Sequence, residues 1–193
     1  YTTRPANDDM ARCEQGVHAF LRAYYHHKSA DWPGNTPFEL AGWTATELAK
    51  MPTYYIMPLH ATMAETVAPH MPDAATIAAC RWLPEDALRV YSAEYERTGF
   101  QGGLQWYRCN TGGLNAAETK LFAGRTMDVP SLFITGAADW GMYQSPGVLR
   151  RMNGTVCTRM LGCHVVDGAG HWVQQEQPEA VVTHLLDFLR AAG

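Results

Sequence analysis

The sequence has no run of about 18 consecutive apolar residues, so it contains no candidate for a membrane-spanning helix. Its five cysteines are scattered and form no CxxC pair, a spacing that argues against a zinc knuckle or a redox dithiol. Basic residues are not in excess: the formal net charge is −4, whereas a nucleic-acid partner requires a basic face. We therefore expect no membrane span, no nucleic-acid partner, no metal and no cofactor.

The 193 residues do contain enough apolar material for a hydrophobic core. Hydrophobic residues make up 47% and charged residues 18%, as in one folded domain or one compact part of a larger one. Unpaired cysteines are typical of a reducing compartment, so we expect a cytoplasmic location. The chain starts at Tyr1 without an initiating Met or an apolar signal core, and we expect that residue 1 does not begin the gene product.

The front part of the chain carries helical patterns and almost no period-two alternation. At its start, apolar residues recur near helical spacing after two acids that suit a helix N-terminus. Helices are expected over residues 7–26, 44–50, 62–67, 84–97 and 103–109. Residues 1–125 are therefore predicted to form one mostly helical region.

The last part of the chain has a different pattern, with short apolar runs bounded by Pro or Gly. Residues 131–135 and 163–166 have the composition of strands buried on both faces. A helix is expected after each strand, the last over residues 178–191. This order predicts the edge of a parallel sheet within residues 126–193, and hence an α/β fold. Because two strands do not make a stable doubly wound sheet, we expect another segment to supply the rest.

The loops that follow these two strands carry a carboxylate and an imidazole. Asp139 lies in the first loop, residues 136–140, and His171 lies in the second, residues 168–172. Catalytic groups collect at the carboxyl ends of parallel strands. Hydrolytic triads need a histidine to move protons and a carboxylate to fix its tautomer, and acid before histidine is the order in α/β-hydrolases.

Other interpretations of these residues remain open. Asp139 could instead cap the helix that follows it. Asp167 is the second candidate acid, although its turn context favours hydrogen bonds to the backbone. The remaining histidines lack ligand spacing and are expected to be solvated or structural.

Three parts of the chain resemble the epoxide hydrolases of the α/β-hydrolase superfamily. Residues 134–139, ITGAAD, are similar to the family's strand-plus-acid segment. Residues 166–172, VDGAGHW, with EQPE at 176–179, are similar to its histidine loop and last helix. Residues 99–108, GFQGGLQWYR, are similar to the cap segment written GFxGxLxWYR, with Gln105 where Asn is common. The resemblance implies a helical cap followed by the C-terminal part of the α/β-hydrolase core.

The resemblance also implies a mechanism and site residues. In that family a carboxylate attacks an epoxide carbon, cap tyrosines stabilise the alkoxide, and a histidine backed by an acid activates the water that hydrolyses the ester. Tyr107 would then be the ring-opening donor, His171 the base and Asp139 its orienting acid; Tyr107 could also be a packed cap aromatic. The implied substrate is a small apolar or epoxide-containing molecule. The aromatic side chains expected to bind it are Trp172, Trp140, Tyr54 and Tyr55.

Three family parts have no counterpart in the sequence: the nucleophile elbow, the HGxP-type oxyanion loop and the first cap tyrosine. Residues 139–141 spell Asp-Trp-Gly but stand where the triad acid belongs. Tyr1 lies just after the expected position of the first cap tyrosine and is not given that role. We expect the chain to be inactive alone and to need an N-terminal companion, a segment or separate chain, that bears the nucleophile.

Other functions are open on the same scaffold. A haloalkane dehalogenase, an esterase or a lactonase would differ at the nucleophile, with Asp for epoxide or halide chemistry and Ser for acyl transfer. Tyr107 favours epoxides, because N–H donors are expected at a halide site. A non-catalytic relative is the third alternative. Retention of both His171 and Asp139 counts against it.

Overall fold

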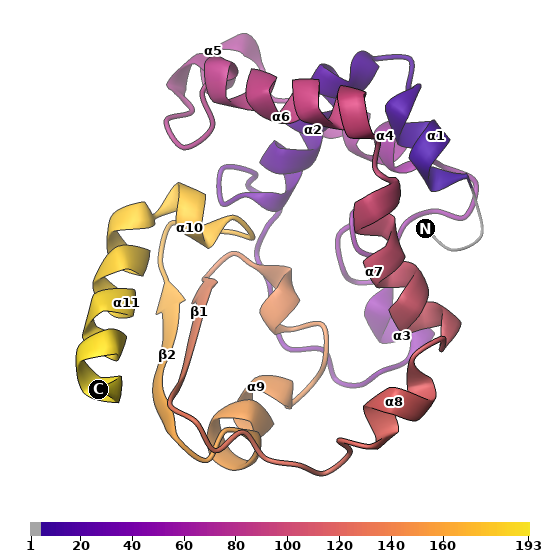
Figure 1. Cartoon of the computed structure of the whole chain (residues 1–193). Helices are drawn as coiled ribbons and strands as arrows, with labels where there is room; N and C mark the ends of the chain where they lie inside the picture. The colour runs from indigo at the N-terminus through magenta and orange to yellow at the C-terminus, as the bar shows by residue number, and fades with distance from the viewer. Residues whose placement is uncertain (1–4) are drawn as a thin grey trace. The chain divides into compact units, whose positions relative to one another are not determined.

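The computed structural model describes residues 5–193, so Tyr1 lies outside the described residues. Figure 1 shows helices throughout the front of the chain and a short parallel sheet near its end. The described residues form two compact units. The first consists of residues up to 27 together with 57–124, and the second of residues 28–56 together with 125–193.

The unit boundary at residue 125 coincides with the change in sequence pattern. Residues 28–56, by contrast, pack with the strands, a grouping that the sequence pattern did not predict. The physical reason is hydrogen bonding: the backbone at residues 28–30 exchanges hydrogen bonds with the loop around His171 and with Glu176. The assignment of residues 1–125 as a cap domain remains a prediction.

The first unit is helical. The prediction of a single helix over 7–26 is wrong. The helix is interrupted before Gly16, whose φ of 77° is a left-handed conformation. Asp73, which caps a helix that the sequence analysis did not predict, accepts a hydrogen bond from the backbone N–H of Thr76. Gly99, with φ 68°, ends the predicted helix that begins at residue 85. The helices are α1 (Ala6–Ala11), α2 (Gly16–Lys28), α4 (Met63–Val67), the 3-10 turn η1 (Ala68–His70), α5 (Ala74–Ala79), α6 (Glu85–Thr98), α7 (Gln101–Gly112) and α8 (Ala116–Lys120).

Aromatic side chains join the aliphatic core of the first unit. Phe20 on α2 meets Phe100 edge to face, with ring centroids 5.7 Å apart. Tyr95 on α6 stacks on Phe100, with ring centroids 4.5 Å apart. The backbone N–H of Phe100 donates to Asn7 Oδ1 at 2.8 Å and ties α1 to the start of α7. These contacts hold α1, α2, α6 and the start of α7 together.

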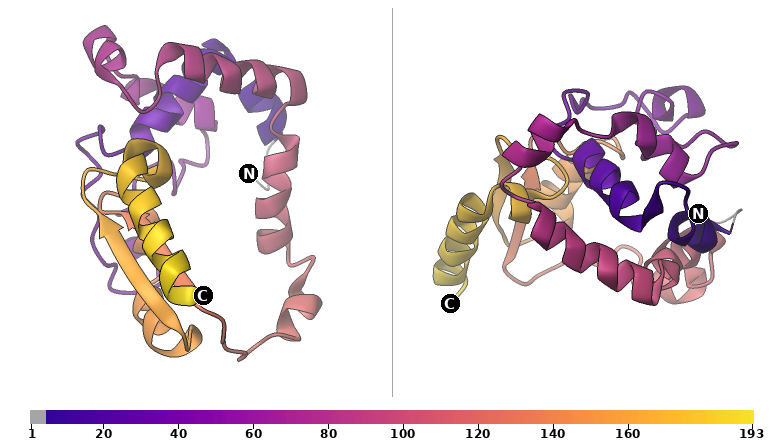
Figure 2. Two further views of the ribbon diagram at one scale, coloured as in Figure 1. Left: turned by 60° about the vertical axis from the view of Figure 1, so that its left-hand side comes forward. Right: turned by 90° about the horizontal axis from the view of Figure 1, so that it is seen from above.

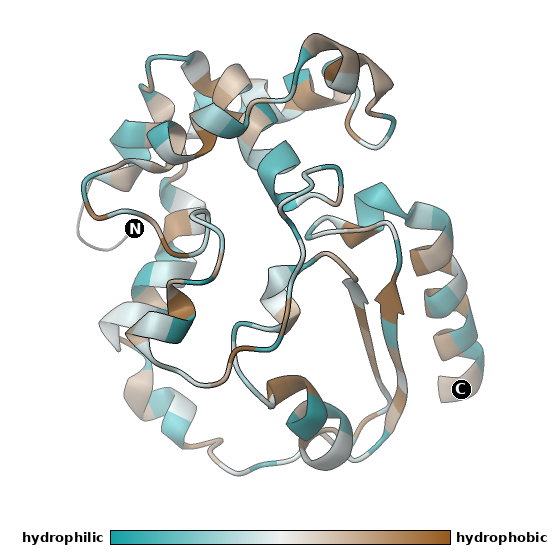
Figure 3. Cartoon of the chain, turned by 180° about the vertical axis from the view of Figure 1, so that it is seen from behind, coloured by the Kyte–Doolittle hydropathy of each residue, from teal (hydrophilic) through white to brown (hydrophobic). Residues whose placement is uncertain are grey.

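The second unit is built on two parallel strands, β1 (Ser131–Gly136) and β2 (Met160–Val166), with Ile134 opposite His164. Both predicted strands are present, and β2 starts three residues earlier than expected. Figure 3 shows hydrophobic residues along much of both strands, and α11 lies along β2 (Figure 2). The other elements are α3 (Ala45–Leu48), η2 (Trp140–Met142), α9 (Val148–Arg151), the π-helical turn η3 (Met152–Val156), α10 (Val173–Glu176) and α11 (Pro178–Ala192).

Two global findings concern the described residues. None of the helices in residues 5–193 is long and apolar enough to cross a membrane. All five cysteines are free thiols, as a reducing compartment favours, and the cytoplasmic location itself remains a prediction.

Candidate functional site

The carboxyl ends of β1 and β2 lie side by side, because the strands are parallel and paired in register up to Gly136 and Val166. The loop after β1 carries Asp139 and the loop after β2 carries His171. The structure brings the two side chains together, with His171 Nδ1 at 3.2 Å from Asp139 Oδ1. Nδ1 is thereby assigned as the N–H donor, which leaves Nε2 with the lone pair that a general base requires.

Asp139 serves two partners at once. As N-cap of η2 it accepts a hydrogen bond from the backbone N–H of Gly141 at 2.8 Å, and the same oxygen faces His171. The cap role and the pairing with histidine therefore coexist. Burial works to raise the pKa of this carboxyl, but the hydrogen bond and charge of His171, the Gly141 N–H and the Lys28 ammonium bring it below its ordinary value. Asp139 is therefore ionised at neutral pH.

Tyr55 lies beside the Asp139–His171 pair. Its hydroxyl lies 3.4 Å from Asp139 Oδ1 and 3.5 Å from His171 Nδ1, both long for hydrogen bonds, and its ring meets the imidazole edge to face. Burial, followed by the charge of Asp139, raises the pKa of Tyr55 far above its ordinary value. The phenol is therefore a neutral donor beside the carboxylate.

Lys28, the last residue of α2, is a buried cation next to the pair and is 4% exposed. Its Nζ lies 5.0 Å from the ring centroid of Tyr55 and 5.5 Å from those of Tyr54 and Trp172, within the range of cation–π attraction. Burial lowers the pKa of Lys28 to about 8, with Asp139 opposing the shift. The ammonium favours an ionised Asp139.

Two glycines allow the loops to approach this closely. A Cβ at Gly136 would lie 2.2 Å from the carbonyl oxygen of Gly170, and a Cβ at Gly170 would lie 2.6 Å from the carbonyl carbon of Ser29. Both obstacles are backbone atoms, which cannot move aside as a flexible side chain can. The second glycine of the GxGH sequence, Gly170, thus has a packing role. Because it has no side chain, the histidine loop lies directly on residues 28–30.

The structure places the four aromatic residues expected to bind substrate in different surroundings. Tyr54 is buried and donates to Asn35 Oδ1 at 2.6 Å, while Tyr55 faces the acid–histidine pair. Trp172 packs edge to face on His171, with centroids 4.8 Å apart. Trp140 is buried, and its ring centroid lies 5.0 Å from that of Phe38. Its indole N–H has no hydrogen-bond partner among the described residues.

The remaining candidates lie away from this cluster or outside its unit. Tyr107 is on α7 in the first unit and is 44% exposed. Asp167, the second candidate acid, is exposed in the turn after β2, and within the described residues no hydrogen bond joins it to His171. Nor does any cluster of three metal-ligating side chains occur across residues 5–193.

The sequence analysis missed three residues at this site, Lys28, Asn35 and Glu176. Lys28 lies two residues after the end of the predicted helix, and nothing in the local pattern indicates that its ammonium is buried. Asn35 joins Tyr54 to the carbonyl of Ser29, a link that no local pattern indicates. Glu176 offered a signal, because an acid four residues after Trp172 can reach back to the backbone N–H groups that open a helix.

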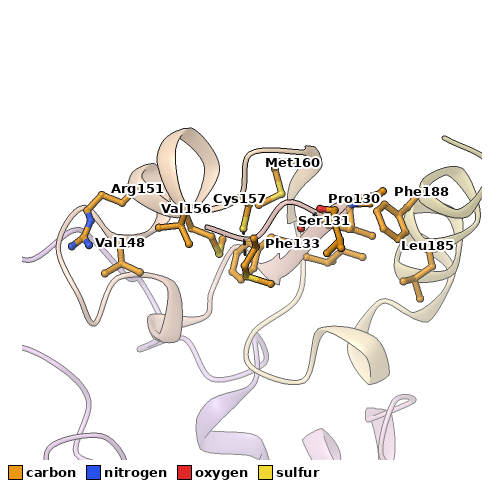
Figure 4. A pocket seen from close by; sticks show the side chains of 15 residues that line it. Pro130, Ser131, Phe133, Val148, Arg151, Val156, Cys157, Met160, Leu185 and Phe188 are labelled. Atoms are coloured by element: carbon orange, nitrogen blue, oxygen red, sulfur yellow. Dashed lines mark hydrogen bonds between the residues drawn. The ribbon is translucent and has the colours of Figure 1, made fainter. Parts of the chain in front are cut away.

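The opposite end of the strands forms an apolar groove of about 830 Å³ in the second unit (Figure 4). Side chains from before and along β1 line it, together with others from α9, η3 and α11. Phe133 points into the groove between Cys157 and Leu185, and Phe188 lies at its edge. It contains no acid–histidine pair. The candidate site therefore lies at the carboxyl ends of the strands, away from this groove.

Comparisons with known proteins give one consistent answer. No protein-family model matches the chain. It is 39% identical to Epoxide hydrolase A of Mycobacterium tuberculosis over 122 residues, which are 62% of this chain and 35% of that protein. It is 35% identical to Epoxide hydrolase B of the same organism over 109 residues, 56% of this chain and 30% of that protein.

Solved structures agree. An epoxide hydrolase from an endophytic Streptomyces matches with a TM-score of 0.73 at 27% identity, over 99% of this chain and 50% of that one. Epoxide Hydrolase A from Mycobacterium thermoresistibile matches with a TM-score of 0.60 at 33% identity, over 90% of this chain and 50% of that one. The chain thus spans about a third of the length of the curated relatives and about half that of the solved ones.

Proposed function

This chain is a relative of the epoxide hydrolases and has the α/β-hydrolase fold, and we propose that it carries the acid–histidine part of an epoxide-hydrolysing active site. The observation that carries the proposal is the His171–Asp139 pair, 3.2 Å apart at the carboxyl ends of two parallel strands. The names of the relatives support the reaction class. The geometry supports the roles of the two residues.

The first proposed step is ring opening. A carboxylate supplied outside these 193 residues attacks one epoxide carbon, a C–O ester bond forms, and the ring C–O bond breaks. The ring oxygen becomes an alkoxide, which takes a proton from a phenol. Tyr107 is the proposed phenol in this chain, because phenols are donors that stabilise a developing oxyanion in a water-poor cleft.

The second proposed step hydrolyses the ester. Nε2 of His171 removes a proton from water while the water oxygen attacks the ester carbonyl. The ester C–O bond then breaks and the diol oxygen leaves with a proton from the imidazolium. The carboxylic acid that remains loses its proton, by way of water, to the phenolate left by ring opening, which restores both the carboxylate and the phenol. Asp139 stabilises the transient imidazolium and fixes the tautomer with Nε2 free. Its lowered pKa keeps it ionised throughout.

We also propose that aromatic side chains around the pair bind the apolar part of the substrate. Tyr55 and Trp172 touch the imidazole, and Tyr54 lies beside Tyr55 with ring centroids 4.9 Å apart. Trp140, next to Asp139 in the chain, is buried against Phe38 and is proposed to support this surface through packing. Such a surface favours apolar epoxides over charged ones.

A further polypeptide is proposed to complete the sheet and supply the nucleophile. Within the described residues β1 pairs with β2 on one side only, and an apolar groove runs beside it. No nucleophile elbow occurs in the sequence. A companion segment or chain that pairs with β1 would cover the groove and bring its carboxylate to the edge that holds His171.

Intact mass spectrometry of the native protein, with and without denaturant, tests this companion. We expect a mass beyond that of residues 1–193, or a second polypeptide, with an elbow in the added sequence. An Asp in the elbow supports epoxide chemistry, and a Ser would favour an esterase or a lactonase. Turnover of an epoxide by purified residues 1–193 alone would overturn the companion proposal.

Isotope labelling tests the reaction itself. The completed protein is given a simple aryl epoxide in H₂¹⁸O, first in a single turnover and then in many. Ester chemistry takes the first added oxygen from the carboxylate, so the single-turnover diol should be unlabelled and later diol labelled. ¹⁸O in the diol of the single turnover would contradict the ester mechanism. Release of halide from a chloroalkane, without diol from the epoxide, would favour the dehalogenase alternative.

A further inference from the structure

Three consecutive backbone N–H groups hold the histidine loop in place. The N–H of Gly170 donates to Glu176 Oε2 at 3.0 Å, that of His171 to the carbonyl of Lys28 at 3.0 Å, and that of Trp172 to Glu176 Oε1 at 3.0 Å. The residues on both sides of His171 are thus bound to one carboxylate. The backbone from which the imidazole projects has no free donor left.

The same carboxylate reaches a second, distant segment. The N–H of Ala30 donates to Glu176 Oε2 at 2.7 Å, across 146 positions of sequence. Segment 28–30 is also the one that a side chain at Gly170 would collide with. Glu176 therefore joins the histidine loop to the segment that ends α2 and carries Lys28.

The burial of Glu176 is unfavourable for an ionised carboxylate. Burial raises the pKa of Glu176 above its ordinary value, although three backbone N–H groups act to lower it. A raised carboxyl pKa means that stability is lost as the pH rises through the folded pKa, so the ionised group costs folding free energy at neutral pH. The three N–H hydrogen bonds thus offset only part of the unfavourable burial of this carboxylate.

We propose that Glu176 is a positioning residue: its carboxylate, held by the N–H groups of Gly170, Trp172 and Ala30, aims the imidazole of His171 at Asp139. This inference rests on the proposed function only for its catalytic consequence. The positioning itself concerns the geometry of the loop. It acts through the backbone and does not require Glu176 to touch substrate.

The experiment compares E176Q with E179Q. Glutamine has nearly the same shape but only one acceptor oxygen, so at least one loop N–H loses its partner. Glu179 is exposed in the first turn of α11 and provides the matched loss of charge. E176D keeps the charge with a shorter reach and should restore part of the effect.

Two readouts follow the loop without any catalysis. Amide exchange at Gly170, at Trp172 or at both should accelerate about tenfold or more in E176Q, since a hydrogen bond to a charged group is lost. The Nδ1–H proton resonance of His171 should broaden or shift. Thermal unfolding should move by only about 4 °C or less, because relief of the buried charge offsets the lost hydrogen bond.

Catalysis by the completed protein gives the third readout. We expect kcat of E176Q to fall about tenfold to a hundredfold with little change in KM, since a misplacement of about 1 Å can have that effect. Unchanged exchange, an unchanged Nδ1–H resonance and full kcat would overturn the inference. Altered loop signals with no effect of H171Q on activity would instead refute the proposed function and leave the positioning role standing. If E176Q does not fold, E176D decides by the same three readouts.

Discussion

A histidine–carboxylate pair lies in each compact unit of the described residues, and the two pairs differ in what surrounds them. His18 on α2 faces Glu85 at 2.9 Å, and His171 faces Asp139 at 3.2 Å. The imidazoles are similarly exposed, at 37% and 34% of the side chain, but the carboxylates are not: Glu85 is 41% exposed and Asp139 14%. Distance alone does not separate a structural pair from a candidate catalytic one.

The hydrogen bonds of the ring nitrogens do distinguish the two pairs. Both nitrogens of His18 are engaged, Nε2 by Glu85 and Nδ1 by Ser92 Oγ at 3.0 Å, and Arg22 already neutralises Glu85. In His171 only Nδ1 has a hydrogen-bond partner among the described residues. The comparison teaches that a general base is recognised by the nitrogen left open and by the burial of its partner acid.

Substitution of the two histidines should give the largest difference between the two pairs. In the completed protein, H171Q is expected to lower kcat for epoxide hydrolysis at least about 10⁴-fold, because the water-activating base is lost. H18Q should leave turnover unchanged. Steady-state diol formation measures both. Equal effects of the two substitutions would mean that His171 has no special role.

D139N should have the next largest effect. The amide keeps the shape of the acid but favours the wrong imidazole tautomer and does not stabilise imidazolium, so kcat should fall by about 10²–10⁴-fold. E85Q is the matched change at the other pair and should weaken folding by about 1–2 kcal/mol with kcat retained. Urea unfolding and diol assays together distinguish the two outcomes. A stability loss without a kcat loss in D139N would make Asp139 only a helix cap.

Alanine at one glycine in each unit tests packing. G170A should destabilise the second unit by about 1–3 kcal/mol or more, because the new Cβ meets backbone at residues 28–30. G103A lies on α7 with nothing within 4 Å of the new Cβ and should stabilise by up to about 1 kcal/mol. Denaturant midpoints report both changes. A tolerated G170A would show that the loop need not lie against that segment.

The last test concerns the pH dependence of stability that Lys28 produces. Its folded pKa of about 8 lies below the ordinary value of 10.5, so between these two pH values the unfolded chain binds more protons. Stability from this group therefore rises with pH across that window. K28M should remove the rise, whereas Lys120, exposed on α8, offers the control K120M. An unchanged slope in K28M would mean that Lys28 titrates normally.

Local patterns in the sequence predicted many of the elements and the order of the two candidate site residues along the chain. Short apolar runs bounded by Pro or Gly predicted β1 and β2, and apolar residues at helical spacing after Pro178 predicted α11. Motif resemblance led to His171, Asp139 and the epoxide hydrolase relation. Helix breaks were harder: the turn before Gly16 depends on a positive φ that an otherwise helical pattern conceals.

Only tertiary structure decided which distant side chains surround the pair. Residues 28–56 belong to the same compact unit as the strands, which places Lys28, Tyr54 and Tyr55 beside the acid–histidine pair. Glu176 joins the histidine loop to Ala30, which is 146 positions away in the sequence. No period or motif carries this information, since burial of an ammonium or a carboxylate depends on what packs over it. Local patterns specify elements, whereas desolvation and hydrogen-bond partners belong to the assembled fold.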